Sequence, residues 1–214
     1  MEDATILCAN PLVLVIDNFF DKETADHIFD LTQNAFERAR VIKRAVAKED
    51  DSRTNQQSVI NQWADPIATA LFEKISGVVR LPPENAEPGK VLYYRKEERF
   101  TAHRDGFSLA QGHVDQWMSG GQRLFTTLAY LNDVESGGET EFPALKISVK
   151  PKLGRLLVFA NTVPGTNEVH PHSLHAGNST GDGIEKKVLA TWWRENMYHV
   201  PRTYPEEDGV YKIV

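Results

Sequence analysis

In the N-terminal part of the chain, a short apolar run is ended by polar residues, and a segment with apolar residues at helical spacing follows. Leu12–Ile16 is apolar and partly β-branched, and Asp17 interrupts it, which predicts a strand followed by a turn. From Asp21 to about Arg38 the apolar positions recur at roughly helical spacing, with Asp21 as the expected N-cap. The pattern therefore predicts strand, turn and helix in that order.

A second helix is predicted after Asp65, because a capping residue followed by Pro66 at the first helical position marks a helix start and an apolar stripe follows. Between the two helices, Ala45–Gln57 is polar and rich in charge. This composition is typical of a surface loop. We expect two supporting helices separated by such a loop.

The second half of the chain carries short β-type runs separated by Gly, Pro, Asn and Asp. Many short strands in one domain predict a mainly β fold, a double-stranded β-helix or jelly roll, flanked by N-terminal helices. We expect a single catalytic domain over residues 1–214, with a helical support region at 1–87 and the jelly-roll core at 88–214. The predicted strands are Lys90–Tyr94, Leu124–Leu131, Ile147–Val149, Leu156–Ala160 and Lys187–Trp193.

Composition narrows the classes of partner. The chain has 214 residues, 41% of them hydrophobic, and a formal net charge of −6. A net negative charge disfavours general attraction to nucleic acid or to anionic membrane surfaces, so neither partner is expected. The single cysteine, Cys8, cannot form an intramolecular disulfide, and the N-terminal stretch does not read as a signal peptide or a membrane span. We therefore expect a cytoplasmic protein.

His103 and Asp105 are the first candidate metal ligands. They stand two residues apart, so on an extended strand both side chains point to the same face and can meet one ion. The pair is weak evidence alone, because a surface hydrogen bond between such residues is common. A third ligand far downstream, within HPHSLHAGN, would complete two histidines and one carboxylate.

That ligand set indicates Fe(II). Two histidines and one carboxylate form the facial triad of non-haem iron oxygenases, which leaves positions open for a bidentate 2-oxo acid and for O2. Catalytic zinc sites usually use three histidines, two histidines with glutamate, or cysteine with histidine. Spacing does not choose among His170, His172 and His175 as the third ligand.

The chain resembles the prolyl 4-hydroxylases of the collagen, plant and algal type. The matching segments occur in order along most of the chain, and GGETEFP together with HRD and SLHAG is the most specific part. The matching segments are Arg53-Thr54, VLYY (91–94), FTAHRDGF (100–107), GGQR (120–123), TTLAYLNDVESGGETEFP (126–143), VKPKLG (149–154), SLHAG (173–177) and KVLATWW (187–193).

The resemblance implies roles for individual residues at the metal and the cosubstrate. It selects His175 as the distal metal ligand and implies a lysine that pairs with the distal carboxylate of 2-oxoglutarate. An insertion before that lysine leaves Lys186 and Lys187 as candidates, and the downstream A-x-x-W pattern favours Lys187. By the same correspondence, Tyr94 and Thr140 would donate hydroxyls to this carboxylate, with Thr126 behind them.

The resemblance also implies substrate contacts and an activity. Arg123 and Trp193 correspond to positions near a peptide substrate, and Glu87 to the edge of the same groove, whereas Phe100 stands where relatives often have tyrosine. The implied reaction is hydroxylation of peptidyl proline, with succinate and carbon dioxide released.

The resemblance further implies Fe(II), 2-oxoglutarate and ascorbate as cofactors, and O2 and a proline-rich peptide or protein as substrates. The same residues are also compatible with two other functions. One is hydroxylation of another residue or of a free amino acid, such as lysine. The other is a jelly-roll binding module without turnover.

Overall fold

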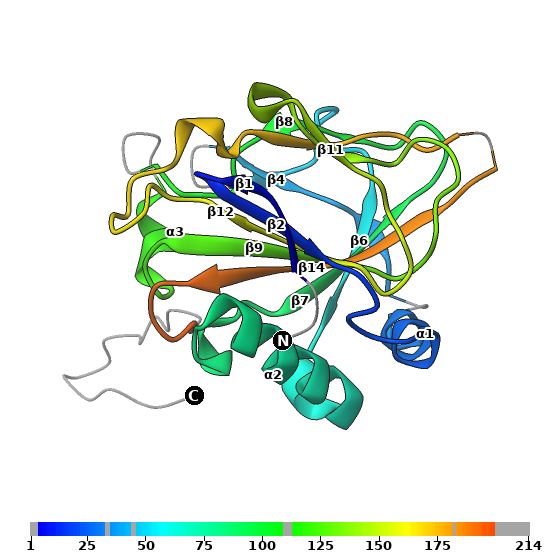
Figure 1. The fold of residues 1–214 in the computed structure, drawn as a ribbon, viewed down its shortest axis with the longest axis horizontal. Helices are drawn as coiled ribbons and strands as arrows, with labels where there is room; N and C mark the ends of the chain where they lie inside the picture. Colours follow the sequence, from blue (N-terminus) through cyan, green and yellow to red (C-terminus); the bar gives the residue numbers. More distant parts are fainter. Residues whose placement is uncertain (1–3, 33–34, 44–45, 109–112, 182, 200–214) are drawn as a thin grey trace, which may run out of the picture.

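Two antiparallel sheets form the body of the computed structural model, which describes residues 4–32, 35–43, 46–108, 113–181 and 183–199 (Figure 1). The larger sheet contains, in spatial order, β1 (Ala4–Ala9), β2 (Leu12–Ile16), β12 (Leu156–Ala160), β9 (Arg123–Tyr130), β14 (Lys186–Arg194), β7 (Gly89–Tyr94), β6 (Gln56–Ile60) and β3 (Glu37–Arg38). The smaller sheet contains β11 (Ile147–Val149), β10 (Thr140–Phe142), β13 (His175–Gly177) and β8 (Phe100–His103). The predicted jelly roll is confirmed.

Helices cover the outer face of the larger sheet, below it in Figure 1. Asp21 caps α1 (Lys22–Asp30) by accepting a hydrogen bond from the Thr24 amide, and Asp65 caps α2 (Pro66–Val79) by accepting one from the Ala68 amide, each at 2.8 Å. Both predicted caps are confirmed. The remaining helical segments are α3 (Val114–Met118) and the 3-10 turns η1 (Gln62–Ala64), η2 (Pro83–Asn85), η4 (Pro143–Leu145) and η5 (Pro171–Ser173).

The N-terminal region differs from its prediction in two ways. The first helix ends at Asp30 rather than near Arg38, and the N-terminal region adds not only the predicted strand β2 but also β1, β3 and β6 to the larger sheet. Part of the predicted loop Ala45–Gln57 forms β5 (Val46–Lys48), which pairs with β4 (Val41–Lys43), while Ala45 itself lies outside the described residues. β3 is short and polar, lies at the edge of the larger sheet and has both residues exposed, so its sequence resembles that of a loop.

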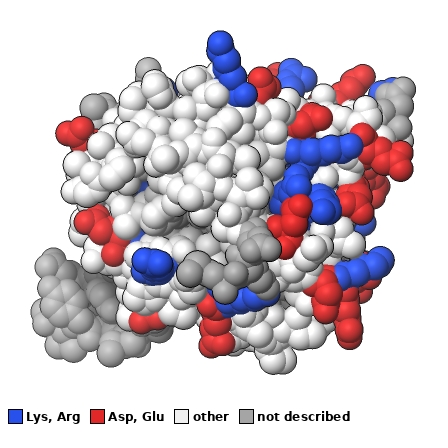
Figure 2. All heavy atoms as spheres, in the orientation of Figure 1, with Lys and Arg blue, Asp and Glu red and all other residues white. Residues whose placement is uncertain are grey.

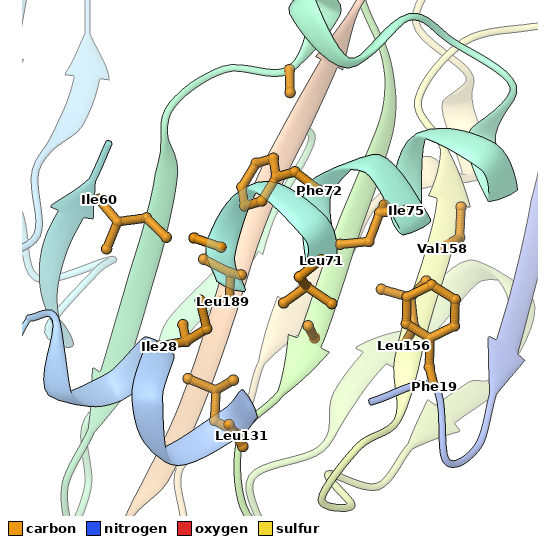
Figure 3. Close-up of a cluster of buried hydrophobic side chains, with 14 of the residues drawn as sticks. Phe19, Ile28, Ile60, Leu71, Phe72, Ile75, Leu131, Leu156, Val158 and Leu189 are labelled. Atoms are coloured by element: carbon orange, nitrogen blue, oxygen red, sulfur yellow. The ribbon is translucent and has the colours of Figure 1, made fainter. Parts of the chain in front are cut away.

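One apolar core fills the space between the helices and the larger sheet. Figure 3 shows apolar side chains of α2 and α1, among them Phe72 and Ile28, against the outer face of the larger sheet, where Leu189 of β14 lies. Full burial of each such side chain contributes about 1.5–3 kcal/mol. The helices therefore hold the outer face of the sheet, which leaves its inner face for the site.

A second apolar cluster lies between the two sheets. It includes Leu92, Tyr130, Phe142, Phe159 and Val188. Because side chains alternate along a strand, Val188 of β14 points to this inner side while Leu189 points to the helices. The two faces of β14 thus belong to different layers of the molecule.

The surface carries mixed charge. Figure 2 shows acidic and basic side chains interspersed on the face turned to the viewer, beside a wide uncharged area. Among the described residues, no helix is both long and apolar enough to cross a membrane.

Two glycines provide a matched test of the fold. Gly137 has φ +72°, and a Cβ there would lie 2.5 Å from the Ser179 carbonyl oxygen, whereas Gly77 sits inside α2 with open space around it. We expect Gly137→Ala to destabilise the protein by about 1–3 kcal/mol, because the backbone must shift or stay strained. Gly77→Ala should stabilise it by about 0.5–1 kcal/mol, because alanine favours the helix. Urea unfolding of both variants checks this, and equal effects would contradict it.

Candidate active site

Three side chains that could bind a metal meet at one end of the smaller sheet. Pairing of β13 with β8 places His175 opposite His103, and Asp105 follows just after β8. Nε2 of His103 lies 3.5 Å from Oδ1 of Asp105, and Nε2 of His175 lies 3.5 Å from Oδ2. One ligand atom from each residue lies within 4.8 Å of the others. The three groups therefore converge on one point.

Backbone carbonyls orient both imidazoles. Nδ1 of His103 lies 2.8 Å from the Thr101 carbonyl oxygen, and Nδ1 of His175 lies 2.9 Å from the Ser173 carbonyl oxygen. A carbonyl only accepts, so Nδ1 must carry the proton and donate it. The lone pair is then on Nε2, which is the nitrogen that faces Asp105 in both rings, as a metal site requires.

A chain of hydrogen bonds orients the carboxylate. The Thr126 hydroxyl donates to Oδ2 of Asp105 at 2.7 Å, and Nδ2 of Asn161 donates to the Thr126 oxygen at 2.9 Å. All three residues are buried. Because the amide can only donate there, the hydroxyl proton is directed at Asp105. Asn161 was not anticipated, since nothing local in the sequence links it to a residue so distant along the chain.

The electrostatic setting suits a cation. Burial lowers the pKa of His175 to about 4, so its imidazole is neutral and able to bind a metal at pH 7. Burial opposes ionisation of Asp105, but the neighbouring imidazoles and Arg123 outweigh it and hold the pKa of Asp105 well below its ordinary value. The site thus presents the neutral imidazole of His175 and an ionised Asp105 carboxylate, with Nε2 of His103 facing the same point.

This donor set fits Fe(II) as a facial triad. Within the described part of the chain, no other group of three or more histidine, cysteine, aspartate or glutamate side chains converges in this way. His170 and His172 lie outside the group, and Nδ1 of His170 instead accepts from the His172 amide at the start of η5. Of the three histidines that spacing left open, the structure brings His175 to the site.

A pocket between the sheets adjoins the three ligands and holds Lys186, Tyr94 and Thr140. Lys186 is 2% exposed, its Nζ lies 4.7 Å from the centre of the Tyr94 ring, and burial lowers its pKa to about 7. Burial raises the pKa of Tyr94 to about 12, so the phenol keeps its proton. Tyr130 donates to the Thr140 hydroxyl at 2.8 Å, which leaves the Thr140 proton free to be donated. The pocket therefore offers one ammonium and two hydroxyl donors.

The placement of Lys187 corrects the prediction from sequence. Its Nζ lies 4.0 Å above the Phe29 ring and 3.9 Å from a carboxylate oxygen of Glu185, on the side of β14 that faces α1. Lys186 shares the inner face with Val188, because both have the same parity on the strand. The pocket lysine is Lys186.

The structure also corrects the prediction that Trp193 lies near the substrate, again by one residue. It is fully buried, its Nε1 donates to Thr127, and its ring packs near Phe72 of α2. Trp192 instead lines the pocket and the groove that leads to it.

A groove of about 550 Å³ opens onto His103 and Asp105, and its walls include Arg123, Phe100 and Trp192. Arg123 lies 4.2 Å from the centre of the Trp192 ring. Phe100 stacks on the His103 ring at 3.4 Å between centroids. This volume is typical of a site for a small molecule or a short peptide segment.

Glu87 lies behind this wall rather than at the edge of the groove. Its two carboxylate oxygens accept from Nε and Nη2 of Arg123 at 2.6 and 2.8 Å, and Arg194 adds a third contact at 2.6 Å. Burial opposes its ionisation, but Arg123 and Arg194 keep the pKa of Glu87 below its ordinary value. Glu87 therefore holds Arg123 in place.

Known proteins match both the sequence and the fold. The 2OG-Fe(II) oxygenase superfamily matches residues 89–194. Probable prolyl 4-hydroxylase 10 of Arabidopsis thaliana is 31% identical over 218 residues, covering 91% of this chain and 73% of that protein. A putative prolyl 4-hydroxylase of Acanthamoeba polyphaga mimivirus is 35% identical over 147 residues, covering 68% of this chain and 60% of that protein.

A solved structure also matches. The viral collagen prolyl hydroxylase from Paramecium Bursaria Chlorella virus-1, in its 2OG complex, superposes with a TM-score of 0.62 and 26% identity. The match covers 87% of this chain and 97% of that one.

The geometry predicts which distal histidine binds metal. His175→Ala should weaken Mn(II) or Fe(II) binding by more than about 100-fold, since even the loss of a residue behind a metal ligand costs about 10- to 100-fold. His172→Ala is the matched control, because its exposed side chain lies outside the converging group. Calorimetric titration under anaerobic conditions measures both variants. Equal affinities would contradict the assignment.

Proposed function

The chain belongs to the prolyl 4-hydroxylase family of 2OG-Fe(II) oxygenases, and on that premise we propose that it hydroxylates a proline residue within a peptide. The observation that carries the proposal is the convergence of His103, Asp105 and His175 beside a pocket that contains a buried lysine. O2 and 2-oxoglutarate are the cosubstrates, and succinate and carbon dioxide are the coproducts. Ascorbate is the reductant expected to restore iron that has become oxidised.

In this proposal Fe(II), when bound, supplies the oxidising chemistry that no amino-acid side chain can perform. His103, Asp105 and His175 would hold it through two nitrogens and one carboxylate oxygen. The Thr126 hydroxyl keeps the Asp105 carboxylate turned toward the ion, and the Thr101 and Ser173 carbonyls keep Nε2 of each histidine available. The protein thus supplies a rigid, prearranged ligand set.

Lys186, Tyr94 and Thr140 would bind the distal carboxylate of 2-oxoglutarate. An ammonium in a buried pocket forms charge-assisted hydrogen bonds that select a dicarboxylate over a monocarboxylate. Leu92 and Val188 line the same pocket with apolar surface, which limits access of water. Lys187 has no part in this binding because it faces α1.

The substrate segment would lie in the groove beside the ligands. Arg123, held by Glu87 and stacked on Trp192, forms one wall, and Phe100 forms another. A proline-rich segment suits such a groove because its polyproline II conformation is largely formed before binding. The aromatic and guanidinium surfaces can pack against pyrrolidine rings without a conformational change in the peptide.

The first test measures turnover. With Fe(II), 2-oxoglutarate and a panel of proline-rich peptides, the protein should form succinate and add one oxygen atom to proline, and His103→Ala should reduce both to background. Mass spectrometry of the peptides identifies the oxidised residue. Oxidation of lysine or of a free amino acid instead of proline would show that the proposed substrate is wrong. Succinate formation by His103→Ala would refute the assignment of the metal ligands.

The second test separates the two lysines by pH. A lysine with a pKa of about 7 is charged below that pH and neutral above it, so binding of 2-oxoglutarate should weaken up to about tenfold per pH unit above pH 7. Lys187→Gln should keep this dependence, whereas Lys186→Gln should bind weakly at every pH. Calorimetry with Mn(II) in place of Fe(II), between about pH 6 and pH 9, measures it. A pH dependence retained in Lys186→Gln would contradict the assignment.

A further inference from the structure

The groove beside the metal ligands has an excess of positive charge. Five cationic residues line it, namely Arg40, Arg53, Lys90, Arg104 and Arg123, and the acidic lining residue among the described residues is Asp105. Asp105 already serves the metal site. The groove is therefore cationic in a protein whose net charge is −6.

Lys90 is the least compensated of these cations. It lies on β7 with the same parity as Leu92 and Tyr94, so its side chain shares the inner face with them. Its Nζ lies 5.1 Å from the centre of the Trp192 ring, and no carboxylate of the described residues lies within ion-pair distance of it. Burial, with added repulsion from Arg123, lowers the pKa of Lys90 to about 8, and the more distant attraction of Glu87 offsets this only in part. Lys90 is half-buried, and an ammonium that has lost part of its solvent without a direct ion pair is stabilised when an anion binds beside it.

Arg53 is a second cation without a direct ion pair among the described residues. It is 6% exposed, its Nε donates to Asn55 and its Nη1 to the Arg40 carbonyl, but its Nη2 is buried without a hydrogen-bond partner. Its guanidinium lies 4.6 Å from the centre of the Phe100 ring, in the wall of the groove. A buried donor without a partner loses stability that a bound acceptor would restore.

Arg123 and Arg104 are compensated differently. Glu87 accepts both hydrogen bonds of the Arg123 fork from behind the groove, and the Pro171 carbonyl oxygen accepts from Nε and Nη2 of Arg104 at 3.2 and 2.8 Å. The fifth cation, Arg40, lies 4.0 Å from a carboxylate oxygen of Glu37. Arg40 and Arg104 are also exposed, so Lys90 and Arg53 are the two groove cations that are at least half-buried and form no direct ion pair among the described residues.

We propose that this pair of cations binds a carboxylate of the substrate, so that the preferred peptide carries glutamate or aspartate beside the target proline. The inference rests on the proposed function for the identity of the target residue, but the carboxylate preference follows from the groove alone. A carboxylate accepts from an ammonium and from a guanidinium nitrogen at once, and partial burial strengthens both contacts. The net charge of −6 disfavours a nucleic-acid strand as the anion.

Binding is measured without turnover, on the full chain with Mn(II) and 2-oxoglutarate. Three proline-containing peptides are compared by calorimetry: one with glutamate beside proline and blocked ends, the same peptide with glutamine, and the glutamine peptide with a free C-terminal carboxylate. The glutamate peptide should bind about tenfold more tightly than its glutamine counterpart. Its affinity should fall with added salt, because the contact is ionic.

Lys90→Gln is the test variant, and Lys22→Gln is the control, since Lys22 is an exposed lysine on α1 whose loss changes the net charge equally. The preference for glutamate should shrink to about twofold or less in Lys90→Gln and stay near tenfold in Lys22→Gln. Thermal unfolding verifies that both variants remain folded. A preference for the free C-terminal carboxylate over glutamate would support the same chemistry and assign it to the end of a chain.

Equal affinity for the glutamate and glutamine peptides would overturn the inference, as would no binding of any peptide or a preference unchanged in Lys90→Gln. Oxidation is then measured separately with Fe(II). A glutamate peptide that binds tightly but is not oxidised at proline would refute the proposed function and leave the carboxylate preference standing. If both peptides bind equally and both are oxidised at proline, the proposed function stands and the carboxylate preference is refuted.

Discussion

The pairing of β13 with β8 places His175 opposite His103, and the rest of the site depends on that register. A shift by one residue would turn one imidazole to the other face of the sheet. The Thr101 and Ser173 carbonyls then set the tautomer of each ring, and Asp105 completes the group from the loop after β8. The remaining features, from the hydrogen bonds behind Asp105 to the pocket and groove, are arranged around these three side chains.

Alternation along β14 divides structural and chemical roles between the two faces of the larger sheet. Leu189 and Trp193 pack toward the helices and stabilise the fold, while Lys186 and Trp192 face the pocket and the groove. One apolar layer therefore holds the strand in place without using any side chain that the site needs. The face that carries Lys186 is free to hold costly buried charge because the opposite face supplies the hydrophobic stabilisation.

Cations with little contact with solvent are energetically costly, and three of them, two buried and one half-buried, indicate which ligands the site binds. Lys186 lies in the pocket, while Lys90 and Arg53 lie in the adjoining groove, and in each case burial lowers the pKa. Within the described residues, none of the three forms a direct ion pair, although each lies over an aromatic ring, so a bound anion would stabilise all three further. Arg123 differs, because Glu87 compensates it within the protein.

The sequence by itself determined the positions of most strands, both helix caps and the ligand motifs around His103, Asp105 and His175, because these depend on local spacing and on short ordered segments. The predictions of Lys187 and Trp193 were wrong by one residue each, because Lys186 and Trp192 are the side chains that face the pocket. Alternation shows which residues of a strand share a face, but only packing against α1 and α2 decides which face points inward. The pairing of Glu87 with Arg123 and of Asn161 with Thr126 likewise joins residues distant along the chain, so only the tertiary structure could reveal it.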